Sequence, residues 1–372
     1  MWHLAKPLPA SDAPVVVKPG HRRGGTVPQE CNLSRGSAPA TASFGATKRL
    51  TIDRVKYDSD EVIARMSPQI IVVGSVNTDL VIRVPHLPRP GETVLGGDFF
   101  QAAGGKGANQ AVAAARLASG PVLFVGAVGD DAFGRQSLAD LQRENLDLRS
   151  LKIVAGMPSG VAQIVVDNRG ENAIAVASGA NAALTADDID AIPAELFTSA
   201  RLLLVSLEVP INTVARALKR AKEHGLLTIL NPAPSSALRN RIELLKFADV
   251  LTPNEIEAAE LIGDEEGGGG PSQICHRLRQ MGVRDCVITL GAAGCLVAGD
   301  PPEPFAGHKV PAVDTTAAGD AFNGALAVAL AEGLSLVEAA RFANRAAALA
   351  VTRSGAQPSL PSRNEIEKLP AI

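Results

Sequence analysis

From residue 201 to the C-terminus, short apolar segments alternate with longer segments of helical periodicity. We expect strands near residues 201–206, 226–230, 248–252, 285–290 and 294–298, and helices near 211–224, 255–262, 272–282, 319–332 and 335–352. Strands that alternate with helices in this way form a parallel sheet with helices on both faces. The sequence therefore predicts an α/β fold, a Rossmann-like three-layer sandwich around a mostly parallel central sheet.

Between residues 69 and 178, the pattern predicts more of this sheet and a second, smaller one. The apolar runs at 69–74 and 121–126 each end in glycine and are typical of buried strands, with helices expected at 106–118 and 132–144. Two further segments, 79–84 and 93–96, alternate more and are typical of half-exposed antiparallel strands, whereas 161–166 and 172–176 flank the turn at 167–170 and predict a hairpin. We expect these four to pair as a small sheet set apart from the main one.

The composition argues against several kinds of partner. The 372 residues are 46% hydrophobic and carry a formal net charge of -3, which favours a large core over binding to nucleic acid or to an anionic membrane. No run of 18 or more apolar residues occurs, so we expect no membrane-spanning segment. The four cysteines form no Cys-x-x-Cys pair, and reduced thiols in a cytoplasmic compartment are the simplest interpretation.

Residues 1–66 differ in composition from the rest, and we interpret them as an N-terminal extension to a domain at 67–372. The first 49 residues contain six prolines and two acidic residues, Asp12 and Glu30, and they lack the apolar segment of a secretory signal. Three interpretations stay open: a disordered tail, a start codon placed before a true start at Met66, or a segment that directs import into an organelle. We also expect a short helix at 52–65 and an exposed glycine-rich loop at 265–271.

Common phosphate-binding and nucleophile motifs are missing from the sequence. The lysine of Gly104-Gly-Lys106 is followed by Gly107, so this segment is no P-loop. The chain contains neither the Gly-x-Gly-x-x-Gly fingerprint nor a Gly-x-Ser-x-Gly elbow, and its six histidines show no metal-ligand spacing. A phosphate site in this chain would therefore be of another kind.

The stretch from Asp314 to Leu330 supplies such a site. Small residues lead to Gly319 and Asp320, and an alanine-rich helical run continues to about Glu332. Backbone N–H groups at the start of a helix have no intrahelical partner, and the helix dipole adds positive charge there, so this terminus predicts an anion site. Asp320 brings negative charge into it, either as an ordinary helix cap or as a base that meets a substrate hydroxyl where the phosphate arrives.

Polar residues and glycines gather at the ends of the predicted strands, where ligands bind in open parallel sheets. They are Asn77, Asp79, Gly104, Gly105, Asn109, Glu208, Asn231, Asn254, Glu257, Thr289 and Gly291. Amide and carboxylate side chains can hold vicinal hydroxyls, and the glycines let the backbone approach a ligand. A polyol site beside an anion site predicts phosphoryl transfer to a sugar, a reaction that depends on positioning and charge stabilisation.

Two motifs carry a family resemblance. Ala103-Gly-Gly-Lys-Gly-Ala-Asn109-Gln-Ala and Asp314-Thr-Thr-Ala-Ala-Gly-Asp320-Ala-Phe-Asn-Gly324 resemble the signatures of the ribokinase-like (PfkB) carbohydrate kinases. The resemblance runs from about Gln69 to Pro361 and leaves out residues 1–66 and the four-glycine insertion. It implies an ATP-dependent kinase that phosphorylates D-ribose at its 5-hydroxyl. It also implies that the small sheet, at about 77–100 and 161–178, is a lid over the sugar and the contact of a homodimer.

The resemblance implies a role for each matching residue. Asp320 is implied as the base, and the amides of Ala317, Ala318 and Gly319 as the anion hole. Ribose contacts are implied for Asn77, Asp79, Gly105, Lys106, Gly107, Ala108, Asn109, Glu208 and Asp320. ATP contacts are implied for Asn231, Thr289, Leu290, Gly291, Ala292, Ala293, Gly294, Gly319, Asp320 and Asn344.

Two cation sites are implied as well. Asn254 and Glu257 match a motif that organises Mg²⁺ and phosphate. A K⁺ site is implied, several of its ligands being backbone carbonyls, at Asp314, Thr316, Ala350, Arg353, Gly355 and Ser359.

Two alternatives stay open. The substrate could be deoxyribose, fructose, a keto-deoxy sugar acid or a nucleoside. A sugar acid would need an arginine near its carboxylate and a nucleoside would need stacking surface, and the implied sugar positions supply neither. The other alternative is a non-catalytic sugar-binding protein of the same fold, which a changed base or anion hole would indicate, but Gly319 and Asp320 are intact.

Overall fold

The computed structural model describes residues 69–264, 270–299 and 302–369, all within one compact unit that spans Lys56–Ile372. The expected extension at 1–66, the helix at 52–65 and most of the loop at 265–271 lie outside the described residues. No helix in the described part of the chain is long and apolar enough to cross a membrane.

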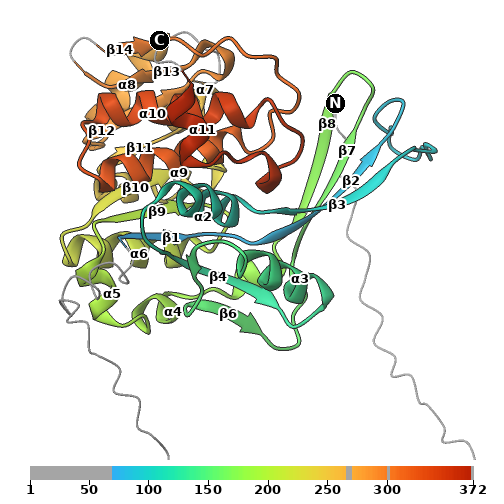
Figure 1. Ribbon diagram of the computed structural model, residues 1–372, viewed down its shortest axis with the longest axis horizontal. Helices are drawn as coiled ribbons and strands as arrows, with labels where there is room; N and C mark the ends of the chain where they lie inside the picture. Colours follow the sequence, from blue (N-terminus) through green and yellow to red (C-terminus); the bar gives the residue numbers. More distant parts are fainter. Residues whose placement is uncertain (1–68, 265–269, 300–301, 370–372) are drawn as a thin grey trace, which may run out of the picture. The chain divides into compact units, whose positions relative to one another are not determined.

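The central sheet has ten strands (Figure 1). Its order is β14-β13-β12-β11-β10-β9-β1-β4-β5, and β6 pairs with β4 off this path. The β12–β13 and β13–β14 pairs are antiparallel. All neighbouring pairs from β12 to β4 in this order are parallel. The strands are β1 (Ile70–Val73), β4 (Val122–Gly129), β5 (Leu146–Asp147), β6 (Leu151–Val154), β9 (Leu202–Ser206), β10 (Leu227–Asn231), β11 (Val250–Leu251), β12 (Asp285–Thr289), β13 (Cys295–Val297) and β14 (Glu303–Phe305).

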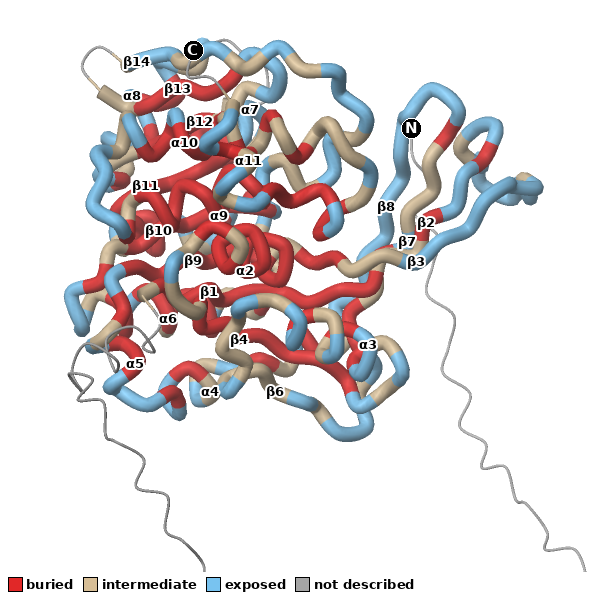
Figure 2. The backbone as a smooth tube through the Cα atoms, viewed as in Figure 1, coloured by how far each residue is buried: buried red, intermediate tan, exposed pale blue. Residues whose placement is uncertain are grey.

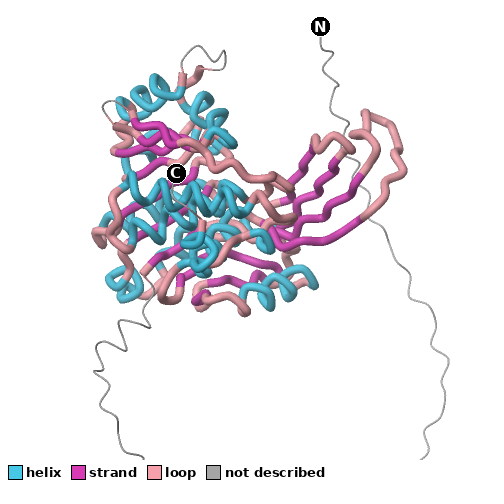
Figure 3. Tube along the Cα trace, turned by 45° about the horizontal axis from the view of Figure 1, so that its top comes forward, coloured by secondary structure: helices cyan, strands magenta, loops and turns pink. Residues whose placement is uncertain are grey.

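Helices cover both faces of this sheet (Figure 3). Side chains alternate along β1, so that Ile70 and Val72 belong to one hydrophobic core and Ile71 and Val73 to the other. The first core also contains residues of α2 (Lys106–Leu117), α3 (Ala132–Leu141), α9 (Ala318–Ala331), α10 (Leu336–Ala350) and α11 (Arg363–Lys368). The second contains residues of α4 (Ala186–Asp190), α5 (Ala194–Ser199), α6 (Ile211–Glu223), α7 (Glu255–Leu261) and α8 (Pro271–Gln280). The predicted three-layer sandwich is confirmed, and Figure 2 shows β1, β4 and β9 buried between the layers.

A second sheet consists of four strands in the order β3-β2-β7-β8 (Figure 1). They are β2 (Asn77–Arg83), β3 (Phe99–Gly104), β7 (Gly160–Val166) and β8 (Asn172–Ala177). The predicted hairpin is confirmed, because β7 and β8 pair antiparallel with Ile164 opposite Ile174. The strand predicted at 93–96 is wrong, since these residues are irregular and Leu95 is exposed. The partner of β2 is instead β3, which runs directly into the glycine turn at Gly104 and Gly105.

The other predicted elements have counterparts within a few residues, although β11 keeps only two of the five residues expected at 248–252. Short elements without a strong pattern were not predicted: β5, β6, β14, α4, α5, α11 and the 3-10 helices η1 (Gly179–Ala183), η2 (Ser235–Leu238), η3 (Ile242–Phe247), η4 (Gly291–Ala293) and η5 (Gln357–Ser359). Cys275, Cys286 and Cys295 are buried free thiols, as expected.

The strand order places a crevice at the centre of the sheet. β1 lies between β4 and β9, and the connections on its two sides run in opposite directions across the sheet. Ligands bind in open α/β sheets beyond the carboxyl ends of the strands at such a switch point. The small sheet begins at Asn77, a few residues beyond the end of β1, so the fold brings it to the same crevice.

Candidate active site

The segments that follow β1 and β9 meet at Glu208. The Ser75 hydroxyl donates to Glu208 Oε2 over 2.6 Å, and the backbone N–H of Lys106 donates to the same oxygen over 3.1 Å. Glu208 therefore ties the loop after β1 to the start of α2. A cavity of about 480 Å³ opens beside it, lined by Asn77, Lys106, Val176, Ser178, Asn181, Ala182, Leu207, Glu208, Val209, Pro210 and Pro234.

Asp79 lies on β2 against the glycine turn. A Cβ on Gly104 would overlap the Asp79 carboxylate, and Gly105 has a φ of 90°, so both positions require glycine. Burial raises the pKa of Asp79 to about 7, and the negative charges of Glu208 and Asp320 add to the rise. Three carboxylates, those of Asp79, Glu208 and Asp320, thus interact in this part of the site.

Lys106 is the cation that balances these carboxylates. Burial favours the neutral amine, yet the negative charges of Asp320, Glu208, Glu257 and Asp79 together outweigh burial and raise the pKa of Lys106. The lysine lines the cavity beside Glu208 and also a second cavity at the start of α9. It therefore stays charged between the two halves of the site.

Asn77 is held by a residue that the motifs did not single out. Asn181, in η1, donates from Nδ2 to Asn77 Oδ1 over 2.8 Å and to the carbonyl of Val76 over 3.0 Å. Its Oδ1 accepts the backbone N–H of Val76 over 2.9 Å. Because every polar atom of the Asn181 amide is engaged, the orientation of the Asn77 amide is determined too, with its Nδ2 left for a ligand.

Asp320 does not cap α9. The helix begins at Ala318 and its cap is Ala317, while Asp320 is the third helical residue and is buried. Its Oδ2 accepts from Asn109 Nδ2 over 2.9 Å and its Oδ1 from Gln110 Nε2 over 3.0 Å. Burial raises the pKa of Asp320, opposed by Lys106 and by these two hydrogen bonds. Of the two sequence-based interpretations, the geometry favours the base.

The turn before Asp320 has the form of an anion hole. Ala317 has a φ of 59°, which makes it the one non-glycine residue of the described chain in the left-handed region, and such strain gathers at functional sites. The Ala318 amide donates to the Thr315 carbonyl over 3.3 Å. The predicted trio is thereby reduced, because Ala318 already has a partner, and the amides of Ala317 and Gly319 are the ones left for an anion at this helix start.

A cavity of about 230 Å³ lies over this turn, and Lys106 lines both this cavity and the one beside Glu208. It is lined by Lys106, Asn231, Ala233, Thr252, Asn254, Glu257, Thr289, Thr315, Ala317, Ala318, Gly319, Asp320 and Asn323. Lysine, amide groups and a positive helix end surround it, so the cavity suits the phosphates of a nucleotide.

A third, mainly apolar cavity of about 230 Å³ extends from there between η4 and α10. Of the residues implied to contact ATP, it is lined by Thr289, Gly291, Ala292, Gly294, Gly319 and Asn344. Leu290 and Ala293 instead close the η4 turn through backbone hydrogen bonds. Gly294 has a φ of 99°, and a Cβ there would overlap the Phe305 carbonyl. Asn344 donates to the Ala306 carbonyl over 2.8 Å and so fixes the far wall.

Asn254 and Glu257 have a structural role as well as a place in the site. Asn254 caps α7, and the two residues exchange hydrogen bonds of 2.8 and 2.9 Å in a capping box. Both line the cavity over the anion hole. Burial raises the pKa of Glu257. Among the described residues no group of three or more His, Cys, Asp or Glu could hold a metal, so a divalent ion here would rely on few protein ligands.

The implied K⁺ residues lie on two segments that the structure brings together. Asp314 accepts the Gly355 N–H on Oδ2 over 2.8 Å and the Thr316 N–H on Oδ1 over 2.9 Å. The backbone N–H groups of Val313 and Asp314 both donate to the Val351 carbonyl at the end of α10. Burial acts to raise the pKa of Asp314, but these hydrogen bonds prevail and lower it. Asp314 therefore stays ionised between the segments.

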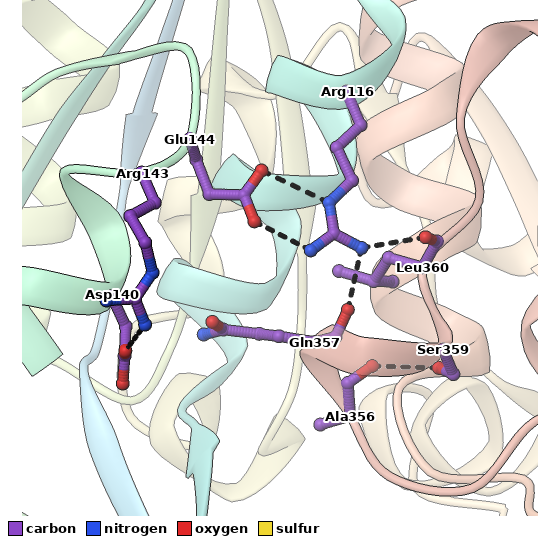
Figure 4. Close-up of polar contacts among 8 residues, drawn as sticks. All are labelled: Arg116, Asp140, Arg143, Glu144, Ala356, Gln357, Ser359 and Leu360. Atoms are coloured by element: carbon purple, nitrogen blue, oxygen red, sulfur yellow. Dashed lines mark hydrogen bonds and ion pairs between the residues drawn. The ribbon is translucent and has the colours of Figure 1, made fainter.

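Arg116 binds the backbone of the segment that contains Gln357 and Leu360 (Figure 4). Its guanidinium makes a bidentate pair with Glu144, at 2.6 and 3.1 Å, and donates to the carbonyls of Gln357 and Leu360 at 2.8 Å each. Ser359 turns its hydroxyl to the Ala356 carbonyl over 2.8 Å. Arg353, another implied K⁺ residue, points away and pairs with Glu365 over 2.5 Å, so its carbonyl is the atom left for a cation.

The sequence of the chain matches a known family over most of its length. The pattern of the pfkB family of carbohydrate kinases fits residues 67–363. This chain belongs to that family. It is 41% identical to the ribokinase of Haemophilus influenzae over 305 residues, which are 81% of this chain and 97% of the relative. It is 42% identical to the ribokinase of Bacillus subtilis, again over 81% of this chain and 98% of the relative.

Solved structures of pfkB-type kinases share the fold described above. The ribokinase of Thermotoga maritima superposes with a TM-score of 0.73 at 37% identity, over 80% of this chain and 97% of the other. The ribokinase of Arabidopsis thaliana, solved in complex with ribose and ATP, gives a TM-score of 0.71 at 34% identity, over 82% and 98%. The ribokinase-like α/β fold with its second small sheet is therefore shown.

Some residues implied by the resemblance to this family act through packing rather than through the cavities. A Cβ on Gly107 would overlap the backbone of Gly74, and the Ala108 amide donates to the Ser75 carbonyl over 2.8 Å. Sequence reasoning missed Gln110, Asn181 and Asn323, which are buried. For Gln110 and Asn323 a signal existed, because each is an amide in an otherwise alanine-rich helix, where a buried polar group needs a partner.

Proposed function

We propose that this pfkB-family carbohydrate kinase phosphorylates D-ribose at its 5-hydroxyl, with ATP as the phosphoryl donor. The observation that carries the proposal is the place of Asp320. Its buried carboxylate lines the cavity over the free amides at the start of α9, and Lys106 lines both this cavity and the cleft of Asn77 and Glu208. The names of the ribokinase relatives and the ribose and ATP complex of the Arabidopsis enzyme support the same substrates.

In the proposed reaction, Asp320 takes the proton of the 5-hydroxyl as the oxygen attacks the γ-phosphorus of ATP. The new oxygen–phosphorus bond forms while the bond to the bridging β–γ oxygen breaks, and ADP leaves. The amides of Ala317 and Gly319 and the Lys106 ammonium lie where negative charge collects during this transfer. Asn231, Thr289, Gly291, Gly294 and Asn344 are proposed to hold the nucleotide.

The cleft chemistry favours a neutral sugar over the alternatives. Its described lining contains no arginine for a sugar acid and no aromatic ring for a nucleoside base. Of the residues that line the cleft, Asn77 offers a donor from Nδ2 and Glu208 offers acceptors, which together suit the hydroxyls of a ribose. Asn109, which is bonded to Asp320, would reach the sugar through its unpartnered Oδ1.

An ADP-release assay over a panel of substrates tests the proposal. Ribose, deoxyribose, fructose, a keto-deoxy sugar acid and adenosine are compared at equal subsaturating concentration, so that the rates rank kcat/KM. We expect ribose to be fastest. Faster turnover of any other substrate would assign the site to that substrate, and binding of ribose without turnover of any sugar would favour a non-catalytic sugar-binding protein.

Mg²⁺ and K⁺ are proposed as cofactors. Mg²⁺ is usually held by one or two carboxylates together with substrate phosphates and water, so Glu257, supported by Asn254, fits this ion, which would neutralise charge on the transferring phosphate. For K⁺, Asp314 and the carbonyls at the negative end of α10 form an oxygen-rich pair of segments. The ligands we propose are the oxygens of Asp314, Thr316, Ala350, Arg353, Gly355 and Ser359.

The small sheet is proposed as the lid over the sugar and as a homodimer contact. Register places Phe100, Val81, Ile164 and Ile174 in one row across the sheet, on the same face as Asp79. The exposed fractions of Phe100 and Ile174 are 40% and 55%. β8, which Figure 2 shows exposed, continues this apolar face. We propose that the face packs against the same face of a second copy. Ile174→Arg should convert a dimer into a monomer in light scattering, and an unchanged mass would contradict the proposal.

We propose a cytoplasmic location, with import into an organelle through residues 1–66 as the alternative. All of the proposed site residues lie beyond Met66. A chain that begins at Met66 should therefore keep full activity in solution. Comparing the cellular distribution of the full chain and the shortened chain, each fused to a fluorescent protein, tests the location.

A further inference from the structure

Gln110 is buried at the centre of the site but belongs to none of the roles above. It lies on α2 with none of its surface exposed. Its Nε2 donates to two acceptors at 3.0 Å each, Asp320 Oδ1 and Asn231 Oδ1. Its Oε1 is buried without a partner among the described residues. Gln110 is thus placed as a double donor, and one of its two acceptors is the proposed base.

The contact with Asn231 continues into a chain of hydrogen bonds that returns to Asp320. Asn231 Nδ2 donates to the Thr252 carbonyl over 2.9 Å, and the Thr252 hydroxyl donates to Asn323 Oδ1 over 2.5 Å. Asn323 Nδ2 then donates to the carbonyl of Gly319, the residue before Asp320, over 2.8 Å. The ring joins α2, β10, the end of β11 and α9. Each amide in it is oriented by the next, so the hydrogen bonds of the ring select a single arrangement.

We propose that Gln110 is a positioning residue for phosphoryl transfer, holding the Asp320 carboxylate in its reactive orientation and ionised, and tying it to the nucleotide side of the site through Asn231. The inference rests on the proposed function, in which Asp320 is the base. Asn109 holds the other carboxylate oxygen, so the two neighbouring amides of α2 fix the plane of the group. A carboxylate turned out of that plane would no longer face the incoming hydroxyl.

The charged groups around Asp320 show why a neutral donor matters. Lys106 at the start of α2 favours the ionised carboxylate, while Glu208 beyond β9 disfavours it. Asp79 on β2 and Glu257 on α7 also interact with it. Hydrogen bonds donated to a carboxylate stabilise its charged form. Removing the Gln110 donor should therefore raise the pKa of Asp320, so that a higher pH is needed to ionise the base.

Two variants test this. Gln110→Met keeps the length of the side chain but donates nothing, and Gln110→Glu keeps its shape but places a second carboxyl against Asp320. The control is Thr213→Val, which removes another buried hydrogen bond, from the Thr213 hydroxyl to the Leu184 carbonyl over 2.6 Å, and has no connection to the ring. The measured quantity is kcat between pH 5 and 9 at saturating ribose and ATP, whose acid limb reports the base in the bound complex.

We expect the acid limb of both Gln110 variants to move up by about 1 to 2 pH units. At neutral pH, kcat of Gln110→Met should fall roughly 10- to 100-fold, while both KM values change less than about threefold. The control should lose thermal stability and keep the wild-type pH profile. A merely structural Gln110 would behave like the control, and unmoved acid limbs in both variants would overturn the inference.

The design separates this inference from the proposed function. If the wild-type protein transfers no phosphate to any sugar of the panel, the proposed function has failed. If the wild type is active and the acid limbs stay in place, Asp320 can still be the base while Gln110 has no part in positioning it. If Gln110→Met does not fold, the shape-preserving Gln110→Glu variant decides the question by itself.

Discussion

Asn181 Nδ2 donates a hydrogen bond to Asn77 Oδ1 over 2.8 Å, and this contact decides which end of the Asn77 amide faces the sugar cleft. Asn181 is 1% exposed and is itself fixed by two hydrogen bonds with the Val76 backbone. Asn77 therefore presents a donor rather than an acceptor to a ligand. Glu208, which lines the same cavity, supplies acceptors, so the cleft holds a donor and acceptors in an ordered arrangement before any ligand arrives.

Asn181→Asp tests this order. The substitution keeps the shape and the contact with the Val76 N–H, but it places an oxygen against Asn77 Oδ1, so the Asn77 amide should turn over and face the sugar with an acceptor. We expect KM for ribose to rise about tenfold or more through the lost hydrogen bond, with KM for ATP changed less than about threefold. Kinetics with each substrate varied in turn measure both. A variant with unchanged KM for ribose would show that Asn181 does not orient Asn77.

The sequence predicts the start of the helix at Gly319 and Asp320 well because its signal is local. Gly319, Asp320 and the helix that follows are contiguous, and the structure places them at the start of α9 as expected. The sequence does not show at which position of the helix Asp320 lies. A residue at the helix cap and one three residues after the cap look alike in sequence, and the hydrogen bonds from Asn109 and Gln110, some 210 residues away, are what distinguish them.

Asp79 should make the stability of the free protein depend on pH. Its pKa is about 7 in the folded protein and 3.8 for an unperturbed aspartate. Because the folded pKa is the higher one, the folded state holds this proton between the two values. The contribution of Asp79 to stability is therefore fully present below about pH 4 and is lost as the pH rises through about 7.

We expect Asp79→Asn to stabilise the free protein more at pH 8 than at pH 5, since asparagine carries no charge to bury. Urea unfolding at both pH values, without ligands, measures the free energy of unfolding of each protein. Asp140→Asn, at an acid outside the cleft that is paired with Arg143, is the control and should show no such difference. A stabilisation that is equal at pH 5 and pH 8 would contradict the raised pKa.

The two segments joined by Asp314 and Gly355 predict a response to monovalent cations. Asp314 is six residues before Asp320, so a cation held there would order the anion-hole turn without touching the nucleotide. We expect the rate in K⁺ to exceed the rate in tetramethylammonium at matched ionic strength. K⁺ should also raise the melting temperature, by roughly 1 to 2 °C for each kcal/mol of binding energy. Asp314→Ala should lose both responses, and equal rates and melting temperatures in the two cations would refute the site.

The cation and lid regions were harder to predict because of the kind of contact that holds them. The carbonyls of Gln357 and Leu360 are held by Arg116 from another helix, and backbone ligands leave no mark on side-chain identity. β3 was misplaced because Phe99–Gly104 ends in a glycine turn that reads as a loop, while the β-prone residues at 93–96 are irregular. The wrong strand at 93–96 thus concerns a segment whose structure depends on distant partners rather than on local pattern.

Asp320→Asn separates a base from a structural carboxylate. An asparagine cannot take the proton, so kcat should fall by roughly 10² to 10⁴. Because Asp320 is not the cap of α9, no cap is lost. Asn109 Oδ1 has no partner among the described residues, and a turned Asn109 amide could accept from the new side chain, so stability should change by no more than about 1 to 2 kcal/mol. Calorimetry should find ADP binding intact. A variant that keeps more than about a tenth of the wild-type kcat would remove Asp320 from the chemistry and leave it as a structural member of the hydrogen-bond ring.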